Sequence, residues 1–331
     1  MSPASNHVLL TGGAGFIGSH VSEALLRRGL QLSVVDNLDD FYSPTAKRAN
    51  LEEVQKVGKF CFCELDLCDF DALRQAISDL RPDTIIHLAA RAGVRPSIEN
   101  PQLYERVNVA GTVNLLELAR QLGVKRFIFG SSSSVYGITN RVPFAEDDPC
   151  LRPISPYAAT KLAGEFLCHT YAHLYGLAAV CLRFFTVYGP RQRPDLAIRK
   201  FTDLMESGKP IPVFGDGSMG RDYTFVDDIV AGVLAALDYQ FPPEGTPFDI
   251  FNLGNSHPVS LNELIATLER VTGRVAIRDR RALQPGDVPI TWANTDKASR
   301  MLGYRPATSL AVGLERFVRW FRDETQAAQE G

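Results

Sequence analysis

Short apolar runs alternate with longer amphipathic segments through the first part of this chain. Runs of this length are typical of strands buried in a parallel sheet. They comprise His7–Leu10, Ser33–Asp36, Phe60–Leu65, Thr84–Leu88, Arg126–Phe129 and Ala179–Arg183. The segments between them predict helices, and they comprise Ser19–Arg28, Thr45–Val57, Asp69–Leu80, Gln102–Leu122 and Pro156–Tyr175. Because strands that alternate with helices pair in parallel through right-handed crossovers, the pattern predicts an α/β protein with a doubly wound parallel sheet.

The pattern loosens after Arg183. Turns rich in glycine and proline follow in quick succession, and such loops usually carry a substrate pocket on a rigid scaffold. Residues 227–238 predict a helix that returns to the sheet, and Asp249–Leu253 predicts its last strand. The tail, from Ser260 to Glu324, predicts two helices with irregular joins. We therefore expect a second, smaller domain that is interleaved with the first.

The first strand runs directly into a glycine-rich turn and a helix. Gly12, Gly15 and Gly18 have a GxxGxxG spacing, and Gly29 closes the helix. Glycine lets the backbone approach a pyrophosphate, and the start of a helix offers free N–H groups and the positive end of its dipole. The second strand ends in Asp36, 18 residues after Gly18, where a carboxylate can bond the ribose 2′-hydroxyl of NAD and repel the 2′-phosphate of NADP. This unit predicts a Rossmann-type site for NAD.

Composition excludes several other classes of function. The 331 residues are 45% hydrophobic and carry a net charge of −3, so no basic face for nucleic acid is expected. No apolar run approaches the ~20 residues of a membrane span, and residues 1–6 show no apolar core of a signal peptide; we expect a cytoplasmic protein. The six cysteines form no CxxC pair, which predicts buried free thiols and no metal site. They are Cys61, Cys63, Cys68, Cys150, Cys168 and Cys181.

Candidate catalytic residues lie where the fifth strand ends and on the helix that follows. Ser132 belongs to a run of four serines after that strand, and Tyr157 and Lys161 lie four positions apart on the next predicted helix. That spacing places the phenol and the ammonium on one helical face. A neighbouring ammonium favours the phenolate and lowers the tyrosine pKa, so we expect Tyr157 to exchange a proton with a sugar hydroxyl while Ser132 steadies the oxygen.

These motifs together resemble the extended short-chain dehydrogenase/reductase family, and within it the nucleotide-sugar 4-epimerases. The resemblance covers nearly the whole chain. It includes Asp66-Leu67, the segment from Arg183 to Pro190, Gly220–Tyr223 and Gln284–Val288. It implies an NAD-binding Rossmann domain in residues 1–185 and about 222–253, and a UDP-sugar-binding domain in residues 186–221 and 254–331. Galactose-type epimerases usually have an arginine where Gln284 stands.

The resemblance also implies which residues contact each ligand. For the cofactor, these are Gly12, Gly15, Phe16, Ile17, Gly18, Asp36, Asn37, Asp66, Leu67, Leu88, Ala89, Ala90, Asn108, Tyr157 and Lys161. For the UDP-sugar, they are Val94, Arg95, Ser131, Ser132, Ser133, Thr186, Arg193, Lys200, Phe214, Arg221, Tyr223 and Asp287. Asp66 and Leu67 would flank the adenine, and Arg221, Tyr223 and Asp287 would surround the UDP.

Within that family the chain is most similar to UDP-glucuronate 4-epimerases. The similarity rests on the segments 92–101 and 189–195 and on the four serines. Dehydratase relatives carry Asp-Glu at the positions of Ser133 and Ser134, and UDP-glucuronate decarboxylases carry Glu at the position of Ser134. This chain lacks that acidic side chain, so we expect neither dehydration nor decarboxylation to follow the oxidation of carbon 4. We expect Arg193 to hold the substrate carboxylate, because a guanidinium offers it a planar fork. The alternatives are a UDP-glucose 4-epimerase, a UDP-glucuronate decarboxylase and a non-catalytic NAD-binding protein.

A homodimer is also expected. The resemblance places a two-fold interface on the helices Gln102–Leu122 and Pro156–Tyr175. One stripe of each helix is expected to face the sheet. Apolar residues that lie outside this stripe support the interface, and they are Val109, Leu116, Leu167 and Tyr171.

Overall fold

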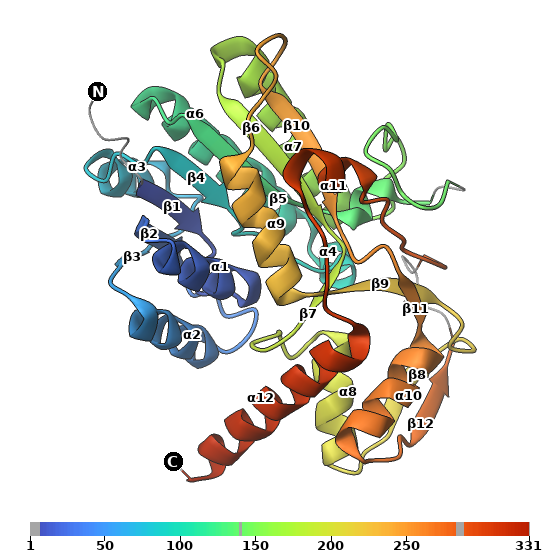
Figure 1. The fold of residues 1–331 in the computed structure, drawn as a ribbon. Helices are drawn as coiled ribbons and strands as arrows, with labels where there is room; N and C mark the ends of the chain where they lie inside the picture. The colour runs from blue at the N-terminus through green and yellow to red at the C-terminus, as the bar shows by residue number, and fades with distance from the viewer. Residues whose placement is uncertain (1–6, 139–140, 283–287, 331) are drawn as a thin grey trace.

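The computed structural model describes residues 7–138, 141–282 and 288–330. Its centre is a parallel sheet of seven strands, in the spatial order β10-β6-β5-β4-β1-β2-β3. The strands are β1 (His7–Thr11), β2 (Gln31–Asp36), β3 (Cys61–Glu64), β4 (Thr84–His87), β5 (Arg126–Ser132), β6 (Ala178–Phe184) and β10 (Phe248–Leu253). The expected doubly wound α/β architecture is therefore confirmed (Figure 1).

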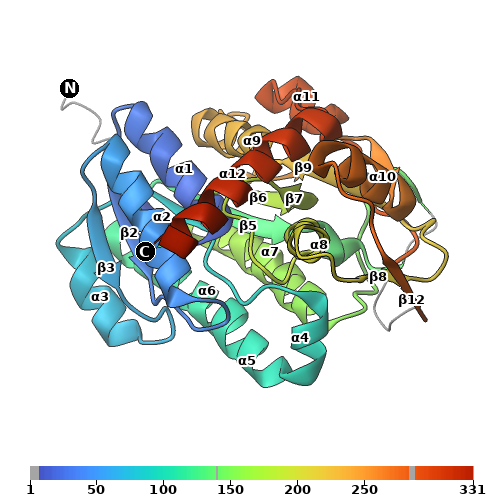
Figure 2. The ribbon, with the colours of Figure 1, turned by 90° about the horizontal axis from the view of Figure 1, so that it is seen from below.

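Helices cover both faces of this sheet (Figure 2). One layer contains α1 (Phe16–Arg27), α2 (Pro44–Val57) and α9 (Val226–Asp238). The other contains α3 (Phe70–Ser78), α6 (Gly111–Leu122) and α7 (Pro156–Tyr175). Successive side chains of a strand point to opposite faces, so Val8 and Leu10 pack in the first layer while Leu9 packs in the second.

The predicted helix over residues 102–122 contains an irregular turn. It runs as α5 (Pro101–Glu105), a π-helical turn (Arg106–Ala110) and α6. A short helix that the sequence pattern did not predict, α4 (Val94–Glu99), precedes it. The π-helical turn buries Asn108, and it changes the helical phase, so Leu116 is fully buried against the sheet. The prediction that Leu116 lies outside the sheet-facing stripe is therefore wrong.

The second half of the chain adds short elements beside the carboxyl ends of the sheet strands. β7 (Thr186–Tyr188), β9 (Gly220–Phe225) and β11 (Pro258–Ser260) form a three-stranded sheet, and β8 (Ile211–Phe214) pairs with β12 (Arg278–Arg281). The helices there are α8 (Ala197–Glu206), α10 (Leu261–Thr272), α11 (Asp296–Leu302) and α12 (Leu310–Glu330). The described residues of the tail thus form three helices and a strand, where two helices were expected. The division into two domains remains a proposal.

Burial corrects one further expectation. All six cysteines are free, and Cys150, Cys168 and Cys181 are buried as predicted. Cys61 is exposed and Cys63 is only partly buried, because β3 is the edge strand of the sheet. Cys68, which follows β3, is also only partly buried. No helix in the described part of the chain is long and apolar enough to cross a membrane.

Candidate active site

A cavity opens at the carboxyl ends of β1, β2, β4 and β5, where α/β sheets bind their ligands. Nearly all of the predicted cofactor residues line it. They are Gly12, Gly15, Phe16, Ile17, Gly18, Asp36, Asn37, Asp66, Leu67, Leu88, Ala89, Ala90, Tyr157 and Lys161. Asn108 does not line this cavity, and its side chain instead bonds both the N–H and the carbonyl of Arg91.

The glycine turn is shaped by close approaches that only glycine allows. Gly12 has φ +74°, and a Cβ there would lie 2.6 Å from the backbone nitrogen of Ala89. A Cβ on Gly18 would lie 2.0 Å from the carbonyl oxygen of Gly12, so α1 packs directly on the turn. Gly15 lines the cavity, and a Cβ there would narrow it. The first turn of α1 carries no acidic residue, which leaves its positive dipole end for an anion.

Asp36 lies at the end of β2 with its carboxylate at the cavity wall. Its two oxygens accept hydrogen bonds from the backbone N–H groups of Ala14, at 3.1 Å, and Leu38, at 2.9 Å. Burial raises the pKa of Asp36, and these two N–H bonds oppose that rise. The carboxylate is thus oriented by the turn itself, and its contact with a ribose remains a prediction.

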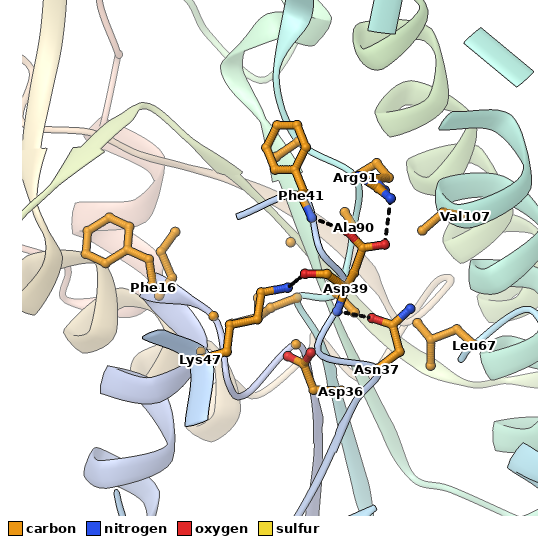
Figure 3. A pocket seen from close by; sticks show the side chains of 18 of the residues that line it. Phe16, Asp36, Asn37, Asp39, Phe41, Lys47, Leu67, Ala90, Arg91 and Val107 are labelled. Atoms are coloured by element: carbon orange, nitrogen blue, oxygen red, sulfur yellow. Dashed lines mark hydrogen bonds and ion pairs between the residues drawn. The ribbon is translucent and has the colours of Figure 1, made fainter. Parts of the chain in front are cut away.

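Sequence reasoning missed a group of cavity residues that follow β2 and β4. Figure 3 shows Asp39, Phe41, Lys47 and Arg91 lying together at the cavity wall. The available signal was their position, since charged residues directly after Asp36 fall at the same sheet edge as the glycine turn. A fifth residue, Tyr42, lines the cavity with a buried hydroxyl that has no hydrogen-bond partner among the described residues.

These features fit a dinucleotide. The glycine cradle leaves room for a backbone-bound diphosphate, and the helix N-terminus provides its positive end. The Asp36 carboxylate and the unpartnered Tyr42 hydroxyl offer polar contacts along the same cavity. Phe16, Ile17 and Leu67 supply apolar walls.

The three candidate catalytic residues meet beside this cavity. Ser155 caps α7 by accepting a hydrogen bond from the N–H of Ala158, and the helix then carries Tyr157 and Lys161 on one face. The Lys161 ammonium donates to the carbonyl oxygen of Gly130, at 2.7 Å. Ser132 ends β5 and accepts hydrogen bonds from Ser134.

The expected lowering of the Tyr157 pKa by Lys161 is not found. Burial raises the pKa of Tyr157, and a hydrogen bond with Ser132 and the charge of Arg193 only oppose that rise. The Lys161 ammonium is directed at Gly130, and its own burial lowers the pKa of Lys161 to about 8. A phenolate at Tyr157 therefore needs a further positive charge in the cavity.

A second cavity adjoins the first at Tyr157 and Arg193, which line both. Eight of the predicted substrate residues line it: Val94, Arg95, Ser131, Ser132, Ser133, Thr186, Arg193 and Arg221. Four do not. Phe214 lies beneath the Arg95 guanidinium at 5.0 Å, and Tyr223 is buried against Tyr188. Lys200 is exposed on α8, and Asp287 lies outside the described residues.

Arg193 already has an acidic partner in this structure. Its Nε and Nη2 donate to the two carboxylate oxygens of Asp195, at 2.9 and 2.8 Å. Burial alone would lower the pKa of Arg193, but Asp195 outweighs it and the pKa is raised. The arginine is thus charged and partly buried, with 16% of its side chain exposed, and it lies at the junction of the two cavities.

Ser131 has a different role from the one predicted. Its hydroxyl donates to the carboxylate of Glu165 on α7. Since a serine has one proton to donate, Ser131 cannot at the same time donate to a substrate carboxylate. Of the hydroxyl residues expected to contact the UDP-sugar, Ser132, Ser133 and Thr186 line the second cavity together with Arg193 and remain candidate donors.

Metal ligands do not gather anywhere in the described residues, where no group of three or more His, Cys, Asp or Glu side chains could hold an ion. One HxxxH spacing does occur, at His169 and His173 on α7, and the two rings stack at 6.4 Å. His87, in β4, is a buried core residue that bonds Thr11 and Thr112.

Comparisons with known proteins agree with this geometry. The sequence pattern of the NAD dependent epimerase/dehydratase family matches residues 8–254. A UDP-glucuronate 4-epimerase of Thermodesulfobacterium geofontis is 44% identical over 97% of each chain. UDP-glucuronate 4-epimerase 4 of Arabidopsis thaliana is 44% identical over 95% of this chain and 75% of its own.

Solved structures give the same result. The UDP-glucuronic acid 4-epimerase of Bacillus cereus in complex with UDP-glucuronic acid and NAD has a TM-score of 0.89 and 36% identity over 96% of this chain and 99% of its own. A Thermotoga maritima UDP-glucose 4-epimerase with UDP-glucose has a TM-score of 0.88 and 34% identity over the same shares. The family match over residues 8–254 and the 44% identical relative agree with the glycine cradle, Asp36, Tyr157 and Lys161 of the first cavity and with Ser132 of the second. The chain therefore belongs to the NAD dependent epimerase/dehydratase family.

Proposed function

We propose that this protein is an NAD-dependent 4-epimerase that converts UDP-glucuronate to UDP-galacturonate. The observation that carries the substrate is the position of Arg193, a charged and only 16% exposed guanidinium where the two cavities meet at Tyr157. A neutral sugar has no group to match this charge, whereas the carboxylate of a glucuronate does. Two relatives named as UDP-glucuronate 4-epimerases, each 44% identical to this chain, support the same substrate.

The chain's own residues account for the proton transfers. Tyr157, as phenolate, removes the proton of the 4-hydroxyl, and Ser132 holds the same oxygen. Bound NAD accepts the hydride from carbon 4 and later returns it, so the cofactor ends as it began. After the 4-keto sugar turns over in the cavity, Tyr157 gives the proton back to the oxygen while hydride arrives on the opposite face of the ring.

The same residues protect the substrate from losing its carboxylate. Oxidation at carbon 4 makes a β-keto acid, which releases carbon dioxide when the breaking bond aligns with the ketone. Arg193 lines the second cavity with Thr186, Ser132 and Ser133, and a sugar bound there would have its carboxylate held out of that alignment. Ser134 stands where decarboxylases carry glutamate, so no acid supplies a proton to the neighbouring carbon.

The test compares Arg193→Ala with wild type on UDP-glucuronate and UDP-glucose, with products resolved by NMR. A charged contact in a closed site contributes about 1.5–3 kcal/mol, so we expect kcat/KM for UDP-glucuronate to fall by roughly 10²-fold and some UDP-pentose to form. Arg74→Ala, which removes an ion-paired arginine on α3 remote from both cavities, is the control. Unchanged turnover of the acid, or a wild type that prefers UDP-glucose, would point to the galactose-type activity instead.

We also propose a homodimer in which α6 and α7 pair with the same helices of a second copy. Phe166 and Leu174 on α7 are each 60% exposed, although both are apolar. Val109, Leu167 and Tyr171 are only partly buried. Light scattering at micromolar concentration should give twice the mass of the chain, and a monomeric mass would contradict the proposal.

The free cysteines support a reducing compartment, the cytoplasm.

A further inference from the structure

The aromatic ring of Phe41 lies between the two halves of the site. Phe41 belongs to the segment between β2 and α2, and it lines the cofactor cavity. The guanidinium of Arg91 lies over its ring at 5.5 Å, and that of Arg193 at 5.3 Å. One ring thus contacts an arginine of the cofactor cavity and the arginine that we assign to the sugar carboxylate.

Hydrogen bonds hold this segment from several sides. The carboxylate of Asp39 accepts from Arg91 at 2.6 Å and from the N–H of Phe41 at 2.9 Å. Lys47, on α2, donates to the carbonyl oxygen of Asp39 at 2.6 Å. Figure 3 shows these three bonds converging on Asp39 at the cavity wall. The backbone that carries the Phe41 ring is therefore held at the cavity wall.

Arg91 is fixed by a different element. Its backbone N–H donates to Asn108 at 2.8 Å, and its carbonyl accepts from the Asn108 amide at 2.9 Å. Asn108 also donates to Thr160 on α7, between Tyr157 and Lys161. The loop after β4 and the segment after β2, which lie on opposite sides of β1 in the sheet, are thus joined across the glycine turn.

The ring contact differs from the Asp195 contact in what it requires of Arg193. Asp195 occupies Nε and Nη2, which are N–H donors that a substrate carboxylate also needs. An aromatic ring attracts a guanidinium through its face and uses no N–H donor. Phe41 can therefore hold the Arg193 guanidinium in place while the N–H groups of Arg193 exchange the Asp195 carboxylate for a substrate carboxylate. The side chain of Asp195 is 42% exposed.

We propose that Phe41 is a positioning residue that couples retention of the cofactor to recognition of the sugar carboxylate. It does so by fastening Arg91 over the cofactor cavity and by placing Arg193 toward the sugar cavity. The second half of this inference rests on the proposed function, whereas the first half does not involve the sugar.

The experiment replaces the ring while keeping an apolar side chain, in Phe41→Leu and Phe41→Met, and restores a ring in Phe41→Tyr. Phe241→Leu is the matched control, because Arg126 lies over the Phe241 ring at 5.8 Å far from both cavities. Each protein is loaded with NAD, and release of NAD is followed after dilution into charcoal. KM and kcat are then measured for UDP-glucuronate and UDP-glucose, and thermal unfolding shows whether each variant folds.

A cation–π contact of this kind corresponds to a change of about 3- to 30-fold. We expect Phe41→Leu and Phe41→Met to release NAD faster by that factor and to raise KM for UDP-glucuronate by a similar factor. KM for UDP-glucose should change less than twofold, kcat should change little, and Phe41→Tyr should behave as wild type.

Equal changes in KM for both sugars, or faster NAD release without a change in KM for the acid, would overturn the coupling. So would Leu and Met variants that match wild type, or a Tyr variant as impaired as they are. If the proposed function is wrong, the wild-type protein will not turn over UDP-glucuronate. The rate of NAD release from the Phe41 variants would then still test the contact between Phe41 and Arg91.

Discussion

A buried ion pair beneath the serine run should carry a large share of the local stability. Glu165 on α7 and Arg183 in β6 have side chains only 2% and 3% exposed. Arg183 donates through Nε at 2.9 Å and Nη2 at 2.7 Å, and Ser131 donates to the same carboxylate. Arg183→Met removes the charge, keeps a shorter unbranched apolar side chain, and leaves Glu165 with the single bond from Ser131.

The magnitude follows from the burial of the partner that remains. Removing one member of a buried ion pair costs about 3–5 kcal/mol, because the other charge stays buried and unpaired. The Nη1 atom of Arg183 has no hydrogen-bond partner among the described residues, so the wild-type pair is already incompletely satisfied. We therefore expect the lower end of that range, ~3 kcal/mol. Replacing both residues by methionine removes both charges and should recover all but about 1 kcal/mol.

Urea unfolding at fixed concentrations of protein and NAD measures these differences, since both ligand binding and association shift apparent stability. Arg74→Met is the control, because the Arg74–Asp71 pair is exposed on both sides and should contribute nothing measurable. A loss below 1 kcal/mol in Arg183→Met would refute the reasoning, and so would a double variant no more stable than the single one.

Three further outcomes follow from the site. Tyr157→Phe deletes only the hydroxyl that exchanges the proton, so turnover should fall ~10²–10⁴-fold while the absorbance of bound NAD remains; a rate near wild type would show that another base acts. Gly15→Ala adds a methyl group that faces the cofactor cavity, 3.2 Å from the Gly12 carbonyl, and we expect weaker binding of NAD by calorimetry with little loss of stability. Lys161 has a pKa of about 8 in the folded, cofactor-free chain and 10.5 as its ordinary value. The unfolded chain therefore holds an extra proton between those values, and the unfolding free energy should rise over that pH range relative to Lys161→Met. A difference independent of pH would contradict this.

Sequence by itself determined the features that depend on neighbouring residues. The strand, glycine turn and helix of residues 7–29 follow one another in the chain, and the close approach of the Gly12 carbonyl to Gly18 lies within the turn itself. The approach of the Ala89 backbone to Gly12, in contrast, depends on the pairing of β1 with β4. Tyr157 and Lys161 share one face of α7 by helical spacing alone. The order of strands and helices likewise predicted the parallel sheet, since the crossover rule leaves few other topologies.

Local spacing also misled where a short irregularity altered it. The π-helical turn at Arg106–Ala110 changes the phase of the helix that follows, and Leu116 faces the sheet as a result. The short strands β7, β8, β9, β11 and β12 were missed because each is defined by a partner far away in the chain and carries little periodicity of its own.

Only the tertiary structure decided how the charged groups are partnered. Arg193 meets Phe41, Arg91 meets Asp39, and Ser131 meets Glu165 across 34 to 152 positions of sequence. Such contacts form between loops at the carboxyl ends of strands, where the sheet brings distant segments together. They leave no repeating pattern in the chain, because a single charged or aromatic side chain has no period. The residue types of the site are therefore visible in the sequence, while their partners depend on how the sheet is wound.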